Sequence, residues 1–163
     1  MRLRDSPTVE VSRELRCAPE HAWQMVTDIS LPTRAPGELQ RVEWLDGADA
    51  VTVGARFSGH NRNEQMGDWQ TISVITEVEP GRRWVWTVGP DSKAPFASWG
   101  FEVDPMRDGT IVRQWARIGD AESPFKTFID AHPDREGEII AFRLGVWQRA
   151  MEANLAVLEA ALS

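Results

Sequence analysis

Tyrosine is absent from this chain of 163 residues, although the chain contains eight tryptophans and six phenylalanines. Its large aromatic side chains therefore contribute apolar surface without phenolic hydroxyl groups. This absence excludes any mechanism in which a tyrosine donates or accepts a proton.

Cysteine and long apolar runs are nearly as scarce. Cys17 is the single cysteine, so no disulfide can form within the chain. The opening residues MRLRDSPT contain no apolar segment of the kind found in secretion signals, and no apolar run approaches the roughly 20 residues that cross a bilayer. We therefore expect a cytoplasmic protein without integral membrane contact, in which Cys17 is a buried, unreactive thiol.

Positive charge is in deficit, with 18 lysines and arginines against 25 aspartates and glutamates and a net charge of −7. A surface that follows the phosphates of nucleic acid needs the opposite balance. We therefore expect no nucleic acid partner.

Familiar catalytic and metal-binding motifs are missing as well. The chain has no G-x-S-x-G, H-E-x-x-H or C-x-x-C motif and no glycine-rich phosphate loop. The three histidines, His21, His60 and His132, are expected on separate elements, which disfavours a three-histidine metal site. The sequence thus predicts neither a metal nor another cofactor.

What the chain does contain is a strand, a short helix, six more strands and a long helix. Residues 8–16 alternate apolar and polar side chains, and residues 19–29 begin with a helix-starting proline and carry an apolar stripe. From residue 39 to 118, turns with glycine or proline separate six runs of strand length, which predicts an antiparallel meander. Residues 120–132 are expected to form a loop, and residues 133–162 carry apolar side chains at spacings of three and four.

Several segments resemble a known family. VSRELRCAPEHAWQMVTD, VGARFSGHNRN, EVEPGRRWVWTVG, DGTIVRQWARIGD and HPDREGEIIAFRL are similar to the polyketide cyclase/dehydrase branch, common in actinobacteria, of the SRPBCC superfamily of START-like proteins. The resemblance implies a single α+β domain over residues 1–163 with the helix-grip fold. In that fold a seven-stranded antiparallel curved sheet surrounds a long C-terminal helix and leaves an internal cavity between them. Members of the superfamily bind lipids, hormones or polyketides and only some catalyse a reaction, so the resemblance assigns no catalytic residue.

Strand alternation and helical periodicity predict which side chains face this cavity. Bulky rings would form its wall, and a few amides would orient the molecule inside. The predicted ligand-binding residues are Trp23, Phe57, Gly59, Asn61, Trp86, Trp99, Phe101, Gln114, Phe142 and Trp147.

The segment GARFSGHNRN allows two orientations, because its apolar start is followed by a polar end. If the strand continues without a bulge, Phe57, Gly59 and Asn61 face inward, Gly59 leaves room for a ligand, and His60 points to water. Alternatively, Asn61 bonds nearby backbone where the strand frays. The reverse orientation would make His60 the best candidate for an acid or base.

Three other polar residues fall close to apolar faces. Gln114 requires either a buried partner or a ligand. Arg13 is either a cation in the cavity or is released to solvent by a bulge. Arg143 either guards the mouth of the cavity or pairs with a carboxylate such as Glu136 or Glu138.

The outer face of the last strand places Trp115 between Arg113 and Arg117, an arrangement typical of cation–π stacking. In the helix-grip fold this strand pairs with the first strand, whose outer residues include Glu10 and Glu14. We therefore expect cross-strand ion pairs for both arginines.

These observations favour the binding of a small hydrophobic or aromatic molecule of polyketide-like or lipid-like chemistry. The alternative is a polyketide cyclase, dehydratase or isomerase that uses the same cavity, with Asp28, Glu64 and Asp68 as candidates for proton transfer. A protein-interaction module is a third hypothesis. A homodimer is compatible with the sequence.

Overall fold

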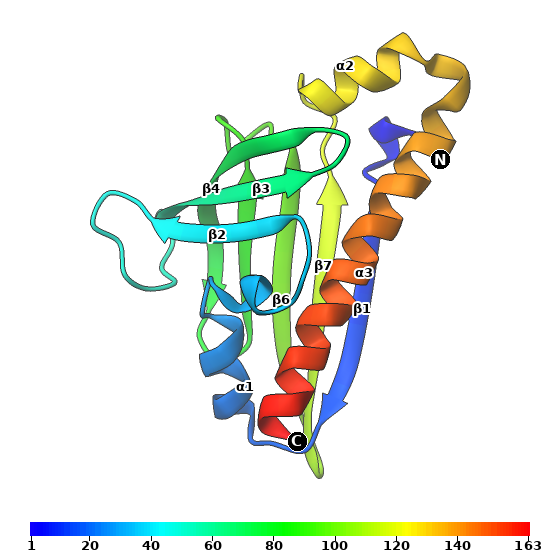
Figure 1. The fold of residues 1–163 in the computed structure, drawn as a ribbon. Coiled ribbons are helices and arrows are strands. Elements are labelled where there is room, and N and C mark those ends of the chain that lie inside the picture. Colours follow the sequence, from blue (N-terminus) through cyan, green and yellow to red (C-terminus); the bar gives the residue numbers. More distant parts are fainter.

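The computed structural model describes all 163 residues and shows a curved antiparallel sheet of seven strands beside a long helix (Figure 1). This confirms the predicted α+β helix-grip architecture. The strands are β1 (Thr8–Leu15), β2 (Leu39–Trp44), β3 (Arg56–Asn63), β4 (Gly67–Glu79), β5 (Arg83–Val88), β6 (Ala97–Met106) and β7 (Gly109–Ile118). The helices are α1 (Pro19–Val26), α2 (Pro124–Ala131) and α3 (Glu136–Leu162), with short 3-10 helices η1 (Leu3–Asp5), η2 (Leu31–Arg34) and η3 (Pro133–Arg135).

The strand order is β1-β7-β6-β5-β4-β3-β2, so six strands form a meander and β1 joins its far end beside β7. The β1–β7 register runs without a break from the pair Thr8 and Arg117 to the pair Leu15 and Thr110. This unbroken register excludes the bulge considered for Arg13. The side chain of Arg13 instead reaches α3, where its Nη2 lies 3.3 Å from Glu152 Oε2.

The segment before α3 corrects one prediction. Residues 120–132 were expected to form a loop, but they contain α2. Ser123 caps this helix, because its Oγ accepts a hydrogen bond from the Lys126 backbone N–H at 3.1 Å, and Pro124 occupies a first-turn position that needs no N–H. The expected helix over 19–29 is shorter than predicted, since α1 ends at Val26.

Helix α3 packs mainly against β1, with further contacts to η2 and β7, and Figure 1 shows it running along the β1 side of the sheet. Its fully buried residues Ile140, Met151, Leu155 and Leu158 form one stripe. Phe142, expected to face the cavity, lies about 200° round the helix from Ile140. Its side chain is 61% exposed. The inward assignment of Phe142 is therefore wrong.

The centre of the core lies between β5, β6 and α1. Trp84 and Phe101 are each 2% exposed, and the predicted inward orientation of Phe101 is confirmed. The indole Nε1 of Trp84 donates a hydrogen bond of 2.9 Å to the backbone oxygen of Val26, at the end of α1. This bond gives the buried indole its polar partner and holds α1 against the sheet.

On the outer face of the sheet, Trp115 makes cation–π contacts with two arginines. Its ring lies between the guanidinium groups of Arg83 and Arg117, at 5.5 and 5.3 Å from the ring centroid, and across Gly100. Arg113 approaches Glu10 at 3.7 Å, as the predicted cross-strand pairing requires. Arg117 instead donates to the hydroxyl of Thr8, so the expected carboxylate partner of Arg117 was wrong.

Candidate functional site

Five aromatic side chains form a continuous row from the β2 side of the sheet to α3; we call it the aromatic row. Neighbouring ring centroids along the row lie 5.8, 6.2, 6.2 and 4.8 Å apart, which is the normal range for aromatic pairs. In order, its members are Trp44, Phe57, Trp86, Trp99 and Trp147. Sequence reasoning placed the last four on the inner face and missed Trp44, although the alternation within QRVEWL puts Trp44 on the same face as Val42.

The aromatic row remains accessible although it lies on the inner face of the sheet. Phe57 is 7% exposed, whereas the four tryptophans are only partly buried. All four tryptophans pack against the hydrophobic core, and each leaves part of its surface accessible. This accessible apolar area on the inner face makes the aromatic row a candidate site.

The rings at the centre of the aromatic row are nearly parallel. The rings of Trp86 and Trp99 are inclined by only 9°, and Trp84 stacks on Trp86 at 4.4 Å and 27°. These rings come from neighbouring positions of β5 and β6, where Trp86 is paired directly with Trp99. Cross-strand pairing thus places a group of nearly parallel indole rings on the inner face, and Trp86 and Trp99 among them remain partly exposed.

A charged cluster closes the α3 end of the aromatic row. The Cζ atom of Arg143 lies 5.5 Å from the Trp147 ring centroid, and its Nη1 donates to Glu38 Oε2 at 2.8 Å. The same carboxylate oxygen accepts a hydrogen bond of 2.9 Å from Asn63 Nδ2. Arg143 was expected either to guard the cavity mouth or to pair with a carboxylate such as Glu136 or Glu138; its carboxylate partner is Glu38, 105 positions away and just before β2.

The orientation of β3 follows the unbulged prediction. The β3–β4 register is continuous, and His60 lies on the outer face with its Nε2 3.2 Å from Arg41 Nη2. Asn61 is on the opposite, inner face. The role given to Gly59 is wrong, because an added Cβ there would lie 2.9 Å from Thr71 Oγ1 and 3.2 Å from Leu39 Cδ1. Protein side chains, and not space for a ligand, occupy the position beside Gly59.

Gln114 was predicted to need either a buried partner or a ligand, and the structure shows a buried partner. Asn154 on α3 donates its Nδ2 to Gln114 Oε1 at 2.9 Å, and the two residues are 4% and 1% exposed. Two other predicted ligand-binding residues are not members of the aromatic row. Phe101 lies beside Trp86, with 6.0 Å between the ring centroids, but is itself enclosed in the core, and Trp23 packs on that core from α1.

None of the three carboxylates considered for proton transfer is suited to that role: two are held in ion pairs and the third is exposed. Burial raises the pKa of Asp28, but hydrogen bonds from Ser30 and the nearby Arg34 guanidinium outweigh this effect and leave the pKa below its usual value. Asp68 pairs with Arg62 at 2.8 Å. Glu64 is exposed in the turn between β3 and β4. An ionised Asp28 cannot supply a proton near neutral pH, so this group does not fit the role of a general acid.

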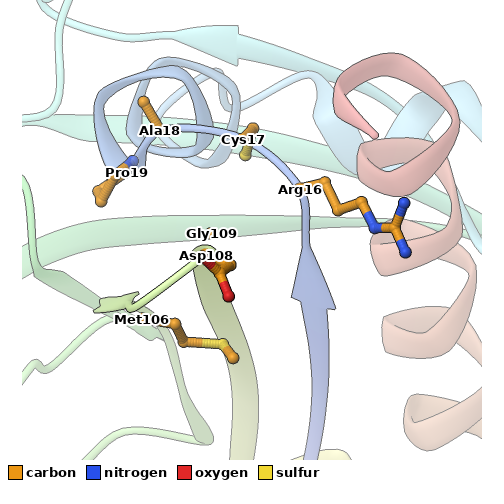
Figure 2. Close-up of a pocket in the computed structure, with 7 residues that line it drawn as sticks. All are labelled: Arg16, Cys17, Ala18, Pro19, Met106, Asp108 and Gly109. Atoms are coloured by element: carbon orange, nitrogen blue, oxygen red, sulfur yellow. The ribbon is translucent and has the colours of Figure 1, made fainter.

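A separate open hollow of about 630 Å³ lies where the β1–α1 connection meets the β6–β7 turn (Figure 2). Figure 2 shows Arg16 extending towards α3, away from Cys17, while Asp108 and Met106 project from the turn. Cys17 is only partly buried, which corrects the expectation of a buried thiol. The polar groups of this hollow do not converge on a common point, so the aromatic row is the better candidate site.

Two further properties concern metals and membranes. No three side chains of the His, Cys, Asp or Glu type gather closely enough to hold a metal ion. No helix combines the length and apolar character needed to cross a membrane.

Known structures share this arrangement of strands and helices. A polyketide-cyclase-like protein of Corynebacterium glutamicum is 24% identical, with 93% of this chain and 89% of that chain covered and a TM-score of 0.64. The di-domain aromatase/cyclase BexL of the BE-7585A biosynthetic pathway is 11% identical, with coverages of 95% and 49% and a TM-score of 0.70. StfQ, the corresponding di-domain protein of the steffimycin pathway, is 14% identical, with coverages of 97% and 52% and a TM-score of 0.67. At these identities the likeness shows a common fold.

The family assignment comes from the sequence itself. Among curated proteins, none matches the chain. The model of one family, described as polyketide cyclase / dehydrase and lipid transport, matches residues 6–162. The chain belongs to the polyketide cyclase / dehydrase and lipid transport family.

Proposed function

We propose that the protein binds a small, flat hydrophobic molecule of polyketide-like or lipid-like chemistry along the aromatic row. The observation that carries this proposal is the partial exposure of four tryptophans on the inner face, two of them inclined by only 9°. Such a surface gains stability when an apolar molecule displaces water from it, by about 25 cal/mol per Å² of apolar area removed from water. Each aromatic contact adds about 0.5–1.5 kcal/mol.

A second candidate function is the cyclisation or dehydration of such a molecule, and the family description favours it. In this case the aromatic row would hold a flexible chain in a reactive shape, which lowers the entropy cost of the reaction. Glu38 is a carboxylate at the end of the row, but its oxygen Oε2 is engaged by Arg143 and Asn63. Binding without turnover is therefore the function that the geometry supports best.

Tryptophan fluorescence tests the proposed binding. Titration with the neutral fluorophore N-phenyl-1-naphthylamine should change the emission of the protein, and Trp99→Ala should weaken binding by about tenfold, or ~1.4 kcal/mol. Trp115→Ala is the matched control, since Trp115 lies on the outer face over Gly100. Circular dichroism should show that both variants are folded. Equal losses of affinity in the two variants would contradict binding at the aromatic row.

Native mass spectrometry of freshly purified protein separates the two candidate functions. A bound small molecule that is released with unchanged mass supports binding. Conversion of that molecule to a product with a different mass, or with the same mass and a different retention time, supports catalysis.

A further inference from the structure

Arg143 is a cation placed directly at the end of an apolar aromatic surface. Its guanidinium lies over Trp147, and Trp147 is in contact with Trp99, whose ring is nearly parallel to that of Trp86 at the centre of the aromatic row. The side chain of Arg143 is only 21% exposed. A partly buried cation at this position can act on any ligand that stacks along the row, because water screens it less than it screens a surface charge.

The donors of Arg143 are only partly used. A guanidinium carries five N–H donors, and the hydrogen bond to Glu38 engages Nη1. A second edge of the same planar group, formed by Nε and Nη2, has the geometry that suits a carboxylate or another acidic oxygen group. Glu38 cannot turn away freely, because Asn63 also holds its Oε2.

We propose that Arg143 is a specificity-determining residue that selects aromatic ligands with an acidic group at one end. This inference rests on the proposed function and adds the class and the orientation of the ligand. The rings of the ligand lie on Trp86 and Trp99, and its acidic group meets the guanidinium beyond Trp147. Glu38 positions Arg143, and its own negative charge weakens the attraction for an anion.

Two fluorophores with one skeleton test this inference. Both 8-anilinonaphthalene-1-sulfonate and N-phenyl-1-naphthylamine contain a naphthalene joined to a phenylamine, and they differ by one sulfonate. Arg143→Gln should weaken binding of the sulfonate by about tenfold and leave the neutral compound within about twofold. Glu38→Gln should strengthen binding of the sulfonate, because the competing charge is removed while an amide oxygen remains to accept from Arg143.

Three further variants control for fold, charge and location. Arg149→Gln removes the same charge from an exposed position of α3 and should change neither affinity. Arg143→Lys keeps the charge but loses the planar fork, so it should restore part of the sulfonate affinity. Trp99→Ala should weaken both compounds, which locates both of them on the aromatic row.

The possible outcomes separate this inference from the proposed function. If neither compound binds the unmodified protein, the proposed function fails, and the role of Arg143 fails with it. If both bind and Arg143→Gln weakens them equally, or leaves both unchanged, the proposed function stands and the selection by Arg143 is overturned. A loss of sulfonate binding in Glu38→Gln as large as that in Arg143→Gln would show that the ion pair merely holds α3 against β2.

Discussion

The hydrogen bond between Asn154 on α3 and Gln114 on β7 should contribute measurably to stability. Its two side chains are 4% and 1% exposed, and the Nδ2–Oε1 distance is 2.9 Å. Asn154→Leu removes the donor, keeps a side chain of similar shape and leaves Gln114 Oε1 buried without this partner. An unsatisfied buried acceptor of this kind costs about 1–3 kcal/mol.

The expected change is large enough for routine measurement. For a domain of 150–250 residues, 1 kcal/mol shifts Tm by about 2–4 °C, so a loss of about 2 kcal/mol lowers Tm by about 4–8 °C. Urea denaturation, followed by tryptophan fluorescence and by circular dichroism, gives the free energy of unfolding directly.

A double-mutant cycle decides whether the two amides act as a pair. Gln114→Met should cost a similar amount, because it leaves the Asn154 amide without its acceptor. The double variant should recover most of the loss, since two apolar side chains of matching shape need no hydrogen bond. If the double variant instead loses the sum of the two single effects, the amides are not coupled, and the reasoning that removed Gln114 from the ligand site is refuted.

Two more predictions concern stability. Gly100→Ala should lower the free energy of unfolding by about 1–3 kcal/mol in urea denaturation, because the new Cβ would lie 2.5 Å from the Trp115 ring and must displace it. Gly37→Ala, with no atom within 4 Å of the added Cβ, is its control, and equal effects would contradict the close packing. Asp28→Asn should destabilise the protein at pH 7, because the lowered pKa of Asp28 means that its ionised form, paired with Arg34, favours the folded state. This difference should disappear as the pH falls below about 4, through the folded-state pKa; a difference that is independent of pH would contradict it.

The faces of the strands were predictable because alternation is a local property. Trp86, Trp99 and Asn61 lie on the inner face that a period of two assigns to them, because the β3–β4 and β5–β6 pairings are continuous. The register shifts at Asn61 and Trp86 fall in the β2–β3 and β4–β5 pairings and do not reverse these faces. The burial of Trp84 follows from the same pattern. Local sequence therefore carried most of the information about the wall of the candidate site.

Helical periodicity alone is enough to exclude Phe142 from the inner side of α3. The stripe through Ile140, Leu144 and Trp147 already defines the inner side of α3, and Phe142 falls two positions after its first member. The helix α2 was missed for a related reason. Ser123 and Pro124 are a helix-start signal, and the mixed composition that follows them concealed it.

Contacts between distant segments could not be read from the sequence. Glu38 meets Arg143 across 105 positions, and Asn154 meets Gln114 across 40. Neither pair leaves a local pattern. The surroundings of Gly59 are a similar case, because Thr71 and Leu39, which fill the space beside it, come from two other segments.

The pairing of β1 with β7 also has a consequence for how the chain folds during synthesis. Strand β1 can pair only after β7 has been synthesised, because Glu14 pairs with Ile111 and Thr8 pairs with Arg117. The strands β2 to β6 need only their sequence neighbours and can form a meander earlier. Contacts of such long sequence separation slow folding, because loop-closure entropy is lost before the contact forms. On the ribosome, β1 therefore stays unpaired until nearly three quarters of the chain has been made, and α3, which packs on β1, is the last element to join.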